Sequence, residues 1–366
     1  MNRRFVFLSL EYINASEKSG ALVRYQHIRD GLYAVIGLVV LLFSSLLTGC
    51  STSAPPSSNH TSSRATQSAQ YSGPINHPVS TTGCGRALSF ASGTSTTVTI
   101  PSNPAVSRGS HTRTYMVHMP ASYDMSRSYA VVLSFHGYGG NAAGMDHSSG
   151  FSQLADRQGF IAVYPQGLLD GDGGKPFWAS VGPIDDGIDD ALFVSDVLNE
   201  LQKDFCIDAH RIYATGFSNG GGMTGFLACR LAGRIAAFAP ISGNFYALPG
   251  GCHPGRPVPI LDFHGTADGT LPYMGISVSK NPVWPLPPIP QWLQEWATRD
   301  GCTHGPAIFL RQSNVTGEQW SGCQENAAVV HYRIEGGGHT GPPFIDGQSS
   351  AAIMWQFFKA HPLSEV

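Results

Sequence analysis

Ser218 lies between two glycines in the stretch GFSNG (residues 216–220), which has the pattern G-x-S-x-G. A run with strand character ends just before this stretch, and a run with helical apolar spacing follows it. On such a sharp turn a serine exposes its Oγ above a sheet, because glycine has no Cβ to block the approach of neighbouring backbone. The backbone N–H of Asn219 would then face a developing oxyanion. The alternative is a glycine-rich strand-to-helix connection without a catalytic role.

The other groups that a nucleophilic serine needs occur at the ends of other predicted strands. Asp268 closes the loop HGTAD, and His339 lies in the later loop EGGGHT. His339 would act as general base toward Ser218, while Asp268 would hold the imidazole tautomer and stabilise its charged form. Upstream, the N–H of Tyr138 in HGYGG is expected to be the second oxyanion donor. The order serine, acid, histidine predicts acyl transfer to water through a covalent acyl-enzyme.

Four aromatic or imidazole side chains are candidates for the surroundings of this site. His136 and His264 follow strands next to glycines, where we expect them mainly to fix loops by hydrogen bonding. His136 is also retained as a candidate substrate contact. Trp178 in KPFWAS and Trp284 in NPVWPLPPIP are candidates for an aromatic wall of the substrate pocket.

Other polar and aromatic residues have simpler interpretations. Asp189 and Asp190 precede a predicted helix and are expected to act as N-caps. Asp262 lies inside a strand and is expected to be a paired structural acid. Trp296 and Trp355 lie on predicted helices and are expected to belong to the core.

Strands and helices alternate along the chain, with no internal repeat and no second core. This alternation predicts one α/β domain with a mostly parallel sheet covered by helices on both faces. The expected strands are 114–119, 129–135, 160–164, 211–215, 235–241, 258–263 and 328–334, and the expected helices are 190–205, a segment from about 219, 291–299 and 350–361.

Composition excludes one large class of partner. The 366 residues have 42% hydrophobic content, enough for a sizeable core. Only 13% are charged and the formal net charge is −3, so no basic stripe is available for a phosphate backbone and we expect no nucleic-acid binding.

The N-terminus resembles a bacterial lipoprotein signal. An apolar run at 32–47 follows three basic residues, ends in the lipobox LTGC, and is shorter than the roughly 20 residues of a spanning helix. We expect a signal peptide at 1–49, lipidation of Cys50 and retention at the extracytoplasmic face of the cell membrane. The alternative is an uncleaved anchor helix. Residues 1–22 fit neither pattern, and we expect translation to start near Leu22 or Val23.

Residues 50–82 are rich in Ser, Thr and Pro and are expected to form a flexible tether, with the catalytic domain at 83–366. Six cysteines remain after Cys50, with no C-x-x-C pair, which favours disulfides over a metal site or free thiols. Fifteen pairings are formally possible. Our prediction is Cys302–Cys323, Cys229–Cys252 and Cys84–Cys206.

Several motifs together resemble the polyhydroxybutyrate depolymerase and feruloyl esterase group, carbohydrate esterase family 1. The similarity covers roughly residues 83–360 and looks closest to bacterial lipoprotein esterases of that group. It implies an α/β-hydrolase fold, the triad Ser218, Asp268 and His339, and no metal or other cofactor. The six cysteines also fall where secreted feruloyl esterases have theirs. The motifs are GCG (83–85), HGYGG, FCID (205–208), GFSNGG followed by LAC, HGTAD, GCT (301–303) and GGGHT.

These features predict a lipid-anchored or secreted serine esterase that acts as a monomer on small or oligomeric esters of feruloyl, acetyl or hydroxyalkanoate type. The membrane would be contacted through the lipid alone. The chain ends soon after its last predicted helix, so we expect no appended binding module and a soluble or envelope-derived ester rather than an insoluble polymer. The alternatives are an acyltransferase or peptidase on the same fold, or a non-catalytic surface binding protein.

Overall fold

The computed structural model describes residues 73–171, 174–181, 187–342 and 344–364. These residues belong to one compact unit, Gln70–Val366. The predicted signal peptide, the lipidation site Cys50 and the tether as far as residue 72 lie outside the described residues.

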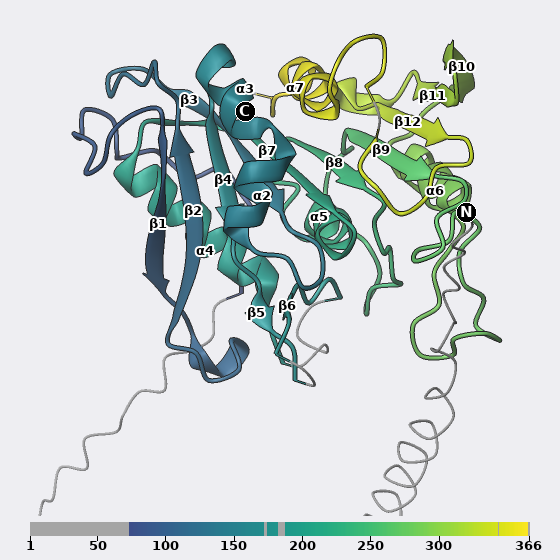
Figure 1. Cartoon of the computed structure of the whole chain (residues 1–366), viewed down its shortest axis with the longest axis horizontal. Helices are drawn as coiled ribbons and strands as arrows, with labels where there is room; N and C mark the ends of the chain where they lie inside the picture. The colour runs from purple at the N-terminus through teal and green to yellow at the C-terminus, as the bar shows by residue number, and fades with distance from the viewer. Residues whose placement is uncertain (1–72, 172–173, 182–186, 343, 365–366) are drawn as a thin grey trace, which may run out of the picture. The chain divides into compact units, whose positions relative to one another are not determined.

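A sheet of ten strands forms the centre of this unit (Figure 1). Six neighbouring strands, in the order β4-β3-β7-β8-β9-β12, are parallel, and antiparallel strands extend both edges as β1-β2 and β11-β10. The strands are β1 (Thr94–Pro101), β2 (Thr112–Met119), β3 (Tyr129–Phe135), β4 (Ile161–Pro165), β7 (Ile207–Phe217), β8 (Ala237–Ile241), β9 (Ile260–Gly265), β10 (His304–Gln312), β11 (Val315–Ser321) and β12 (Val329–Ile334). A separate small hairpin joins β5 (Leu168–Leu169) to β6 (Pro176–Phe177).

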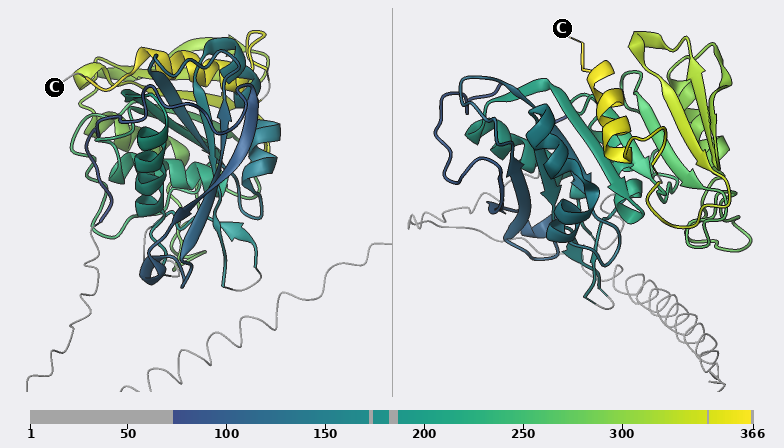
Figure 2. Two further views of the ribbon diagram at one scale, coloured as in Figure 1. Left: turned by 90° about the vertical axis from the view of Figure 1, so that its left-hand side faces the viewer. Right: turned by 45° about the horizontal axis from the view of Figure 1, so that its top comes forward.

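Helices cover both faces of the sheet (Figures 1 and 2). Alternate residues of β3 explain why: Val131 and Leu133 pack into the core beneath α4, α5 and α6, whereas Ala130 and Val132 pack beneath α2, α3 and α7. A strand buried on both faces has no polar side to expose, which accounts for its continuous apolar run. The helices are α2 (Ala142–Ser149), α3 (Phe151–Gln158), α4 (Asp190–Asp204), α5 (Asn219–Arg230), α6 (Ile289–Arg299) and α7 (Ser350–Ala360), with short 3-10 turns η1 (Pro104–Val106) and η2 (Gln324–Asn326).

The predicted α/β fold with a mostly parallel sheet is therefore confirmed. All the expected strands and helices are present, with ends that differ by a few residues; β7, for example, begins at Ile207 rather than at residue 211. Within the described part of the chain, no helix combines the length and apolar character needed to cross a bilayer.

The segment before Gly83, which the sequence assigned to the tether, is bonded to the domain. Ile75 N–H donates to Ser195 Oγ at 3.0 Å, and Thr81 Oγ1 donates to the carbonyl oxygen of Ile207 at 2.7 Å. Hydrogen bonds to the domain thus begin several residues before the predicted boundary at 83.

Three disulfides join Cys84 to Cys206, Cys229 to Cys252 and Cys302 to Cys323, as the sequence predicted. They link positions 122, 23 and 21 residues apart, so one bridge closes a long loop and two close local loops. Disulfides persist in oxidising compartments, which favours folding of this domain outside the cytosol.

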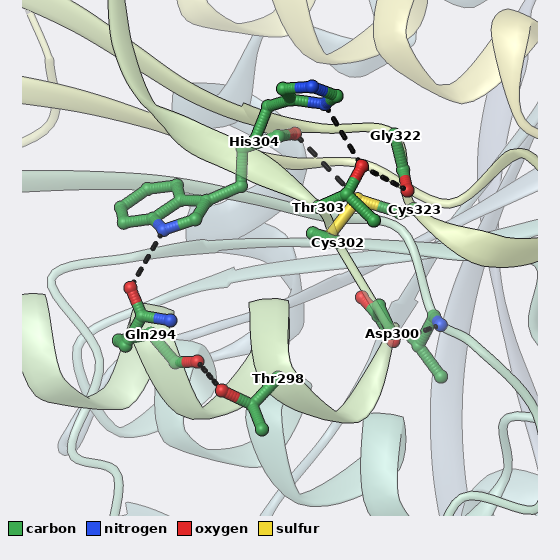
Figure 3. The surroundings of a disulfide bond; sticks show 10 residues. Gln294, Thr298, Asp300, Cys302, Thr303, His304, Gly322 and Cys323 are labelled. Carbon is green, nitrogen blue, oxygen red and sulfur yellow. Dashed lines mark hydrogen bonds between the residues drawn. A yellow bond between two sulfur atoms is a disulfide. The ribbon is translucent and has the colours of Figure 1, made fainter.

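Near the Cys302–Cys323 bridge lies a fully buried acid, Asp300 (Figure 3). Its Oδ1 accepts the backbone N–H of Val258 at 2.8 Å, while its Oδ2 has no hydrogen-bond partner among the described residues. Burial raises the pKa of Asp300 to about 7, although the Val258 N–H and the charges of Arg256 and Arg299 partly oppose this shift. At alkaline pH the fold therefore contains a buried carboxylate whose Oδ2 accepts no hydrogen bond from the described residues.

We expect Asp300→Asn to remove a pH-dependent loss of stability. The pKa of Asp300 is higher in the folded state than its ordinary value of 3.8, so the wild-type protein loses stability as pH rises from 3.8 to about 7. Asparagine keeps an acceptor for Val258 and stays neutral. Between pH 4 and pH 8, the free energy of unfolding of the variant should gain up to about 4 kcal/mol relative to wild type. Urea unfolding at both pH values measures this, and identical pH profiles would refute it.

Candidate active site

Ser218 occupies a strained turn between β7 and α5. Its φ of 58° and ψ of −120° lie outside the regions that side-chain-bearing residues prefer, a feature common at functional sites. Two glycines permit the turn: a Cβ on Gly216 would lie 2.3 Å from the carbonyl oxygen of Gly220, and a Cβ on Gly220 would lie 2.2 Å from the carbonyl oxygen of Phe135. The G-x-S-x-G pattern therefore forms a strand-to-helix elbow, as predicted.

The structure brings Ser218, His339 and Asp268 into one hydrogen-bonded chain. Ser218 Oγ lies 2.8 Å from His339 Nε2, and His339 Nδ1 lies 2.7 Å from Asp268 Oδ2. The three residues follow β7, β12 and β9, whose parallel arrangement places their carboxyl ends at the same edge of the sheet (Figure 1). This geometry allows the imidazole to take the serine proton while the carboxylate orients the ring.

Asp268 is held firmly by its own loop. Its Oδ1 accepts the backbone N–H groups of Thr270 and Leu271, at 2.9 and 2.8 Å. His264 Nε2 donates to the carbonyl oxygen of Leu271 at 2.9 Å and also lies 3.5 Å from Asp268 Oδ2. His264 thus fixes the loop that carries Asp268, which agrees with the structural role expected from the sequence. On the other side, the Phe217 ring packs 4.9 Å from the His339 ring.

The expected oxyanion donors come from two segments. The N–H of Asn219 is the first amide of α5, where backbone N–H groups have no intrahelical acceptor and the helix dipole favours negative charge. In the loop after β3, Gly139 N–H donates to the carbonyl oxygen of Pro176 and Gly140 N–H donates to that of Gly137. The N–H groups of these two residues are therefore used within the protein. The assignment of the Tyr138 N–H as the second donor stays a prediction.

Trp178 connects these two segments. Its indole Nε1 donates to the carbonyl oxygen of His136 at 2.9 Å. Its backbone N–H donates to Asn219 Oδ1 at 2.7 Å, and its carbonyl oxygen accepts Asn219 Nδ2 at 3.0 Å. The Asn219 side chain therefore binds the Trp178 backbone in the way that a neighbouring strand would, and it ties the start of α5 to the loop after β3.

The structure corrects the assignment of His136 as a substrate contact. The ring is buried, its Nδ1 donates to the carbonyl oxygen of Gly137 at 2.8 Å, and its Nε2 accepts the N–H of Gly167 at 3.0 Å. Burial lowers the pKa of His136, which favours a neutral ring with one hydrogen bond at each nitrogen. With both nitrogens engaged, His136 supports the loop that carries Tyr138, and that was the other role expected from its position.

A cavity of about 150 Å³, here called the proximal pocket, lies beside Asn219. Trp284 is half-buried on its wall and packs 5.2 Å from the Tyr246 ring. Trp178 also lines this pocket, but its side chain is fully buried. It therefore forms the inner part of the wall and has no solvent-exposed ring face. The pocket is lined by Phe177, Trp178, Ser180, Asn219, Asn244, Tyr246 and Trp284.

Sequence reasoning missed Asn244 and Tyr246, although a signal for them existed. Both follow β8, the neighbour of the strand that carries Ser218. Ligands of open α/β sheets bind outside the carboxyl ends of the strands, so the residues after β8 were candidates by position.

The two acids expected to cap α4 have different roles. Asp189 is the N-cap, because its Oδ1 accepts the backbone N–H of Leu192 at 2.9 Å. Asp190 is instead the first helical residue and forms a buried ion pair, with its Oδ1 2.5 Å from Arg113 Nη1. Its Oδ2 accepts the N–H of Ala179 at 2.7 Å. The capping prediction was wrong for Asp190, since Arg113 lies 77 residues away in sequence and was not a visible partner.

The remaining structural predictions hold. Asp262 is fully buried, and its Oδ2 lies 2.9 Å from Nδ1 of the equally buried His331. Trp296 and Trp355 are buried in the cores on opposite faces of the sheet.

A serine on an elbow after β7, followed in sequence by an acid after β9 and a histidine after β12, defines the α/β-hydrolase fold. The acetyl xylan esterase from Aspergillus awamori shares this fold, with a TM-score of 0.53 and 17% identity over 72% of this chain and 99% of that protein.

Sequence comparison finds similar esterases. Residues 113–252 match the family described as esterase PHB depolymerase. Feruloyl esterase B of Piromyces equi is 30% identical over 256 residues, 69% of this chain, but this chain spans less than half of that relative's own length, 46%. A probable feruloyl esterase C of Aspergillus niger is 29% identical over 272 residues, covering 70% of this chain and 89% of that protein. These matches support the polyhydroxybutyrate depolymerase and feruloyl esterase group.

Proposed function

We propose that this protein is a serine esterase that hydrolyses carboxylic esters through an acyl-enzyme. The observation that carries the proposal is the unbroken chain of hydrogen bonds from Ser218 Oγ to His339, at 2.8 Å, and from His339 to Asp268, at 2.7 Å. These distances lie within the range required for proton transfer between a nucleophile and its base.

The reaction follows from this geometry. Ser218 Oγ attacks the ester carbonyl carbon while its proton passes to His339 Nε2, and Asp268 stabilises the imidazolium that forms. The carbonyl oxygen becomes an oxyanion beside the N–H groups of Asn219 and Tyr138. When the intermediate collapses, the C–O bond to the alcohol breaks and the alcohol takes the proton from His339. Water then attacks the acyl-enzyme by the same route and releases the acid.

We infer that the substrates are esters of feruloyl, acetyl or hydroxyalkanoate type. The names of the relatives support this range, since they include feruloyl esterases and an acetylxylan esterase/xylanase, and the matching family is described as esterase PHB depolymerase. The aromatic wall that Trp284 and Tyr246 give the proximal pocket is suited to a planar acyl group.

We also infer that the mature protein is held at the extracytoplasmic face of the membrane by a lipid on Cys50, and that it acts there as a monomer. The lipobox that ends at Cys50 and the three disulfides of the domain support this location.

The direct test is hydrolysis of p-nitrophenyl acetate and methyl ferulate by the mature protein. Turnover of either ester supports the proposal, and the ratio of the two rates separates a small acyl preference from an aromatic one. An acyl-enzyme that is stable in water but transfers to a sugar or lipid alcohol would identify an acyltransferase instead. Binding of esters without turnover would identify a non-catalytic binding protein.

A further inference from the structure

A larger cavity, here called the distal cavity, continues from the proximal pocket. Its volume is about 470 Å³, within the range of pockets that bind small molecules. The two spaces share three lining residues, Ser180, Asn244 and Tyr246. The distal cavity therefore lies next to the space beside Asn219 and does not form a separate site elsewhere on the domain.

One face of α5 runs along the distal cavity. Gly222, Gly225, Phe226 and Cys229 line it, and their spacing of three and four residues places them on one side of the helix. Gly222 N–H donates to the carbonyl oxygen of Ser218 at 3.0 Å, so the cavity begins one helical turn from the nucleophile. With a rise of 1.5 Å per residue, this face extends from about 6 Å to about 16 Å beyond Ser218 along the helix axis.

The position of His339 decides which part of an ester points along this face. The leaving alcohol must take its proton from His339, so it lies on the side of Ser218 that faces His339 and Phe217. Neither residue lines the proximal pocket or the distal cavity, which are bounded instead by α5, α6 and the loops near them. The acyl group is therefore the part that points toward the two spaces.

The lining of the distal cavity favours apolar groups over polar ones. Glu295 and Arg299 are the charged residues of the lining, and they pair with each other at 3.2 Å. A charged or strongly hydrated group would find few partners here, whereas an alkyl or aryl chain would be removed from water. The main apolar lining residues are Phe226, Phe245, Leu248, Val278, Leu286 and Trp292.

We propose that the distal cavity binds the far end of a long apolar acyl group, whose first segment fills the proximal pocket. This inference rests on the proposed esterase function and extends it to a substrate class, namely esters with acyl chains longer than acetate or a single aromatic ring. Tyr246 lines both spaces and packs against Trp284 of the proximal pocket, so the acyl chain passes Tyr246 on its way from Ser218.

The test compares p-nitrophenyl esters from acetate to dodecanoate, each below its micelle concentration. In the wild-type protein, kcat/KM should rise by up to about fourfold per added methylene until the cavity is filled. Ala247→Trp and Val278→Trp each add a large ring to an exposed lining residue. We expect each variant to lower the ratio of dodecanoate to acetate kcat/KM by about tenfold or more. Thr99→Trp, at an exposed position of β1, should leave that ratio unchanged.

Each outcome has a distinct meaning. A kcat/KM that falls with chain length while acetate is hydrolysed overturns the acyl-cavity proposal and leaves the esterase intact. A rising profile that neither cavity variant changes places the chain elsewhere and also overturns it. If no ester is hydrolysed, the proposed function fails and the acyl-cavity proposal fails with it.

Discussion

Replacing Ser218 by alanine is expected to lower kcat/KM for p-nitrophenyl acetate by about 10,000-fold or more. The Oγ that lies 2.8 Å from His339 Nε2 is the atom that forms the new bond to the acyl carbon, and alanine has no substitute for it. The oxyanion donors and the pocket remain, so a small residual rate above the uncatalysed reaction should persist. Steady-state kinetics with purified protein, after confirming an unchanged unfolding transition, measure the effect.

Ser152→Ala is the matched control. Ser152 is buried, whereas Ser218 is half-buried, and it lies on α3 with its Oγ 2.7 Å from the Tyr164 hydroxyl, on the face of the sheet opposite α5. It should keep kcat/KM within a few-fold of wild type. A Ser218→Ala protein that retains a tenth of wild-type activity would mean that another residue is the nucleophile.

Breaking the buried Arg113–Asp190 ion pair is expected to cause a large loss in the free energy of unfolding. Both side chains are essentially inaccessible to water, and the Arg113 guanidinium also lies 3.7 Å from the centre of the Phe193 ring. Asp190→Asn keeps an oxygen for the N–H of Ala179 but leaves a buried positive charge unpaired. We expect the free energy of unfolding to fall by about 3–5 kcal/mol, measured by urea denaturation.

A double variant shows whether the unpaired charge is the cause. Arg113→Met combined with Asp190→Asn removes both charges at similar volume and should recover more than half of the loss, because a buried ion pair adds little beyond satisfying its own charges. If the double variant is as unstable as the sum of the two single changes, the two side chains act independently and the ion-pair explanation is wrong.

The parts of this protein that were predictable are those whose signal is local. The period of apolar residues located the parallel strands and the main helices, since burial on two faces leaves a continuous apolar run such as that of β3. The active-site residues could be found because each follows a strand, and the parallel order brings those strand ends to one edge.

The parts that could not be predicted depend on partners distant in sequence. Asn219 and Trp178 are 41 residues apart, and no pattern near either one indicates that an amide side chain will bind a backbone segment. The edge strands were missed for a different reason: β1 consists mostly of threonine and serine, and β10 is largely exposed, so neither shows a strong apolar period. Edge strands face solvent more than central strands do and resemble loops in composition.

The hydrogen bonds between Asn219 and Trp178 restrict which substitutions the pocket can accept. Trp178 lines the proximal pocket, and its indole N–H also donates to the carbonyl oxygen of His136, which links the two segments proposed to bind the oxyanion. A smaller residue at position 178 would enlarge the pocket for a new ester but would also remove that link. If the proposed function is correct, a substitution at Trp178 would change both selectivity and rate, whereas substitutions at Tyr246 or Trp284 would change the pocket wall alone.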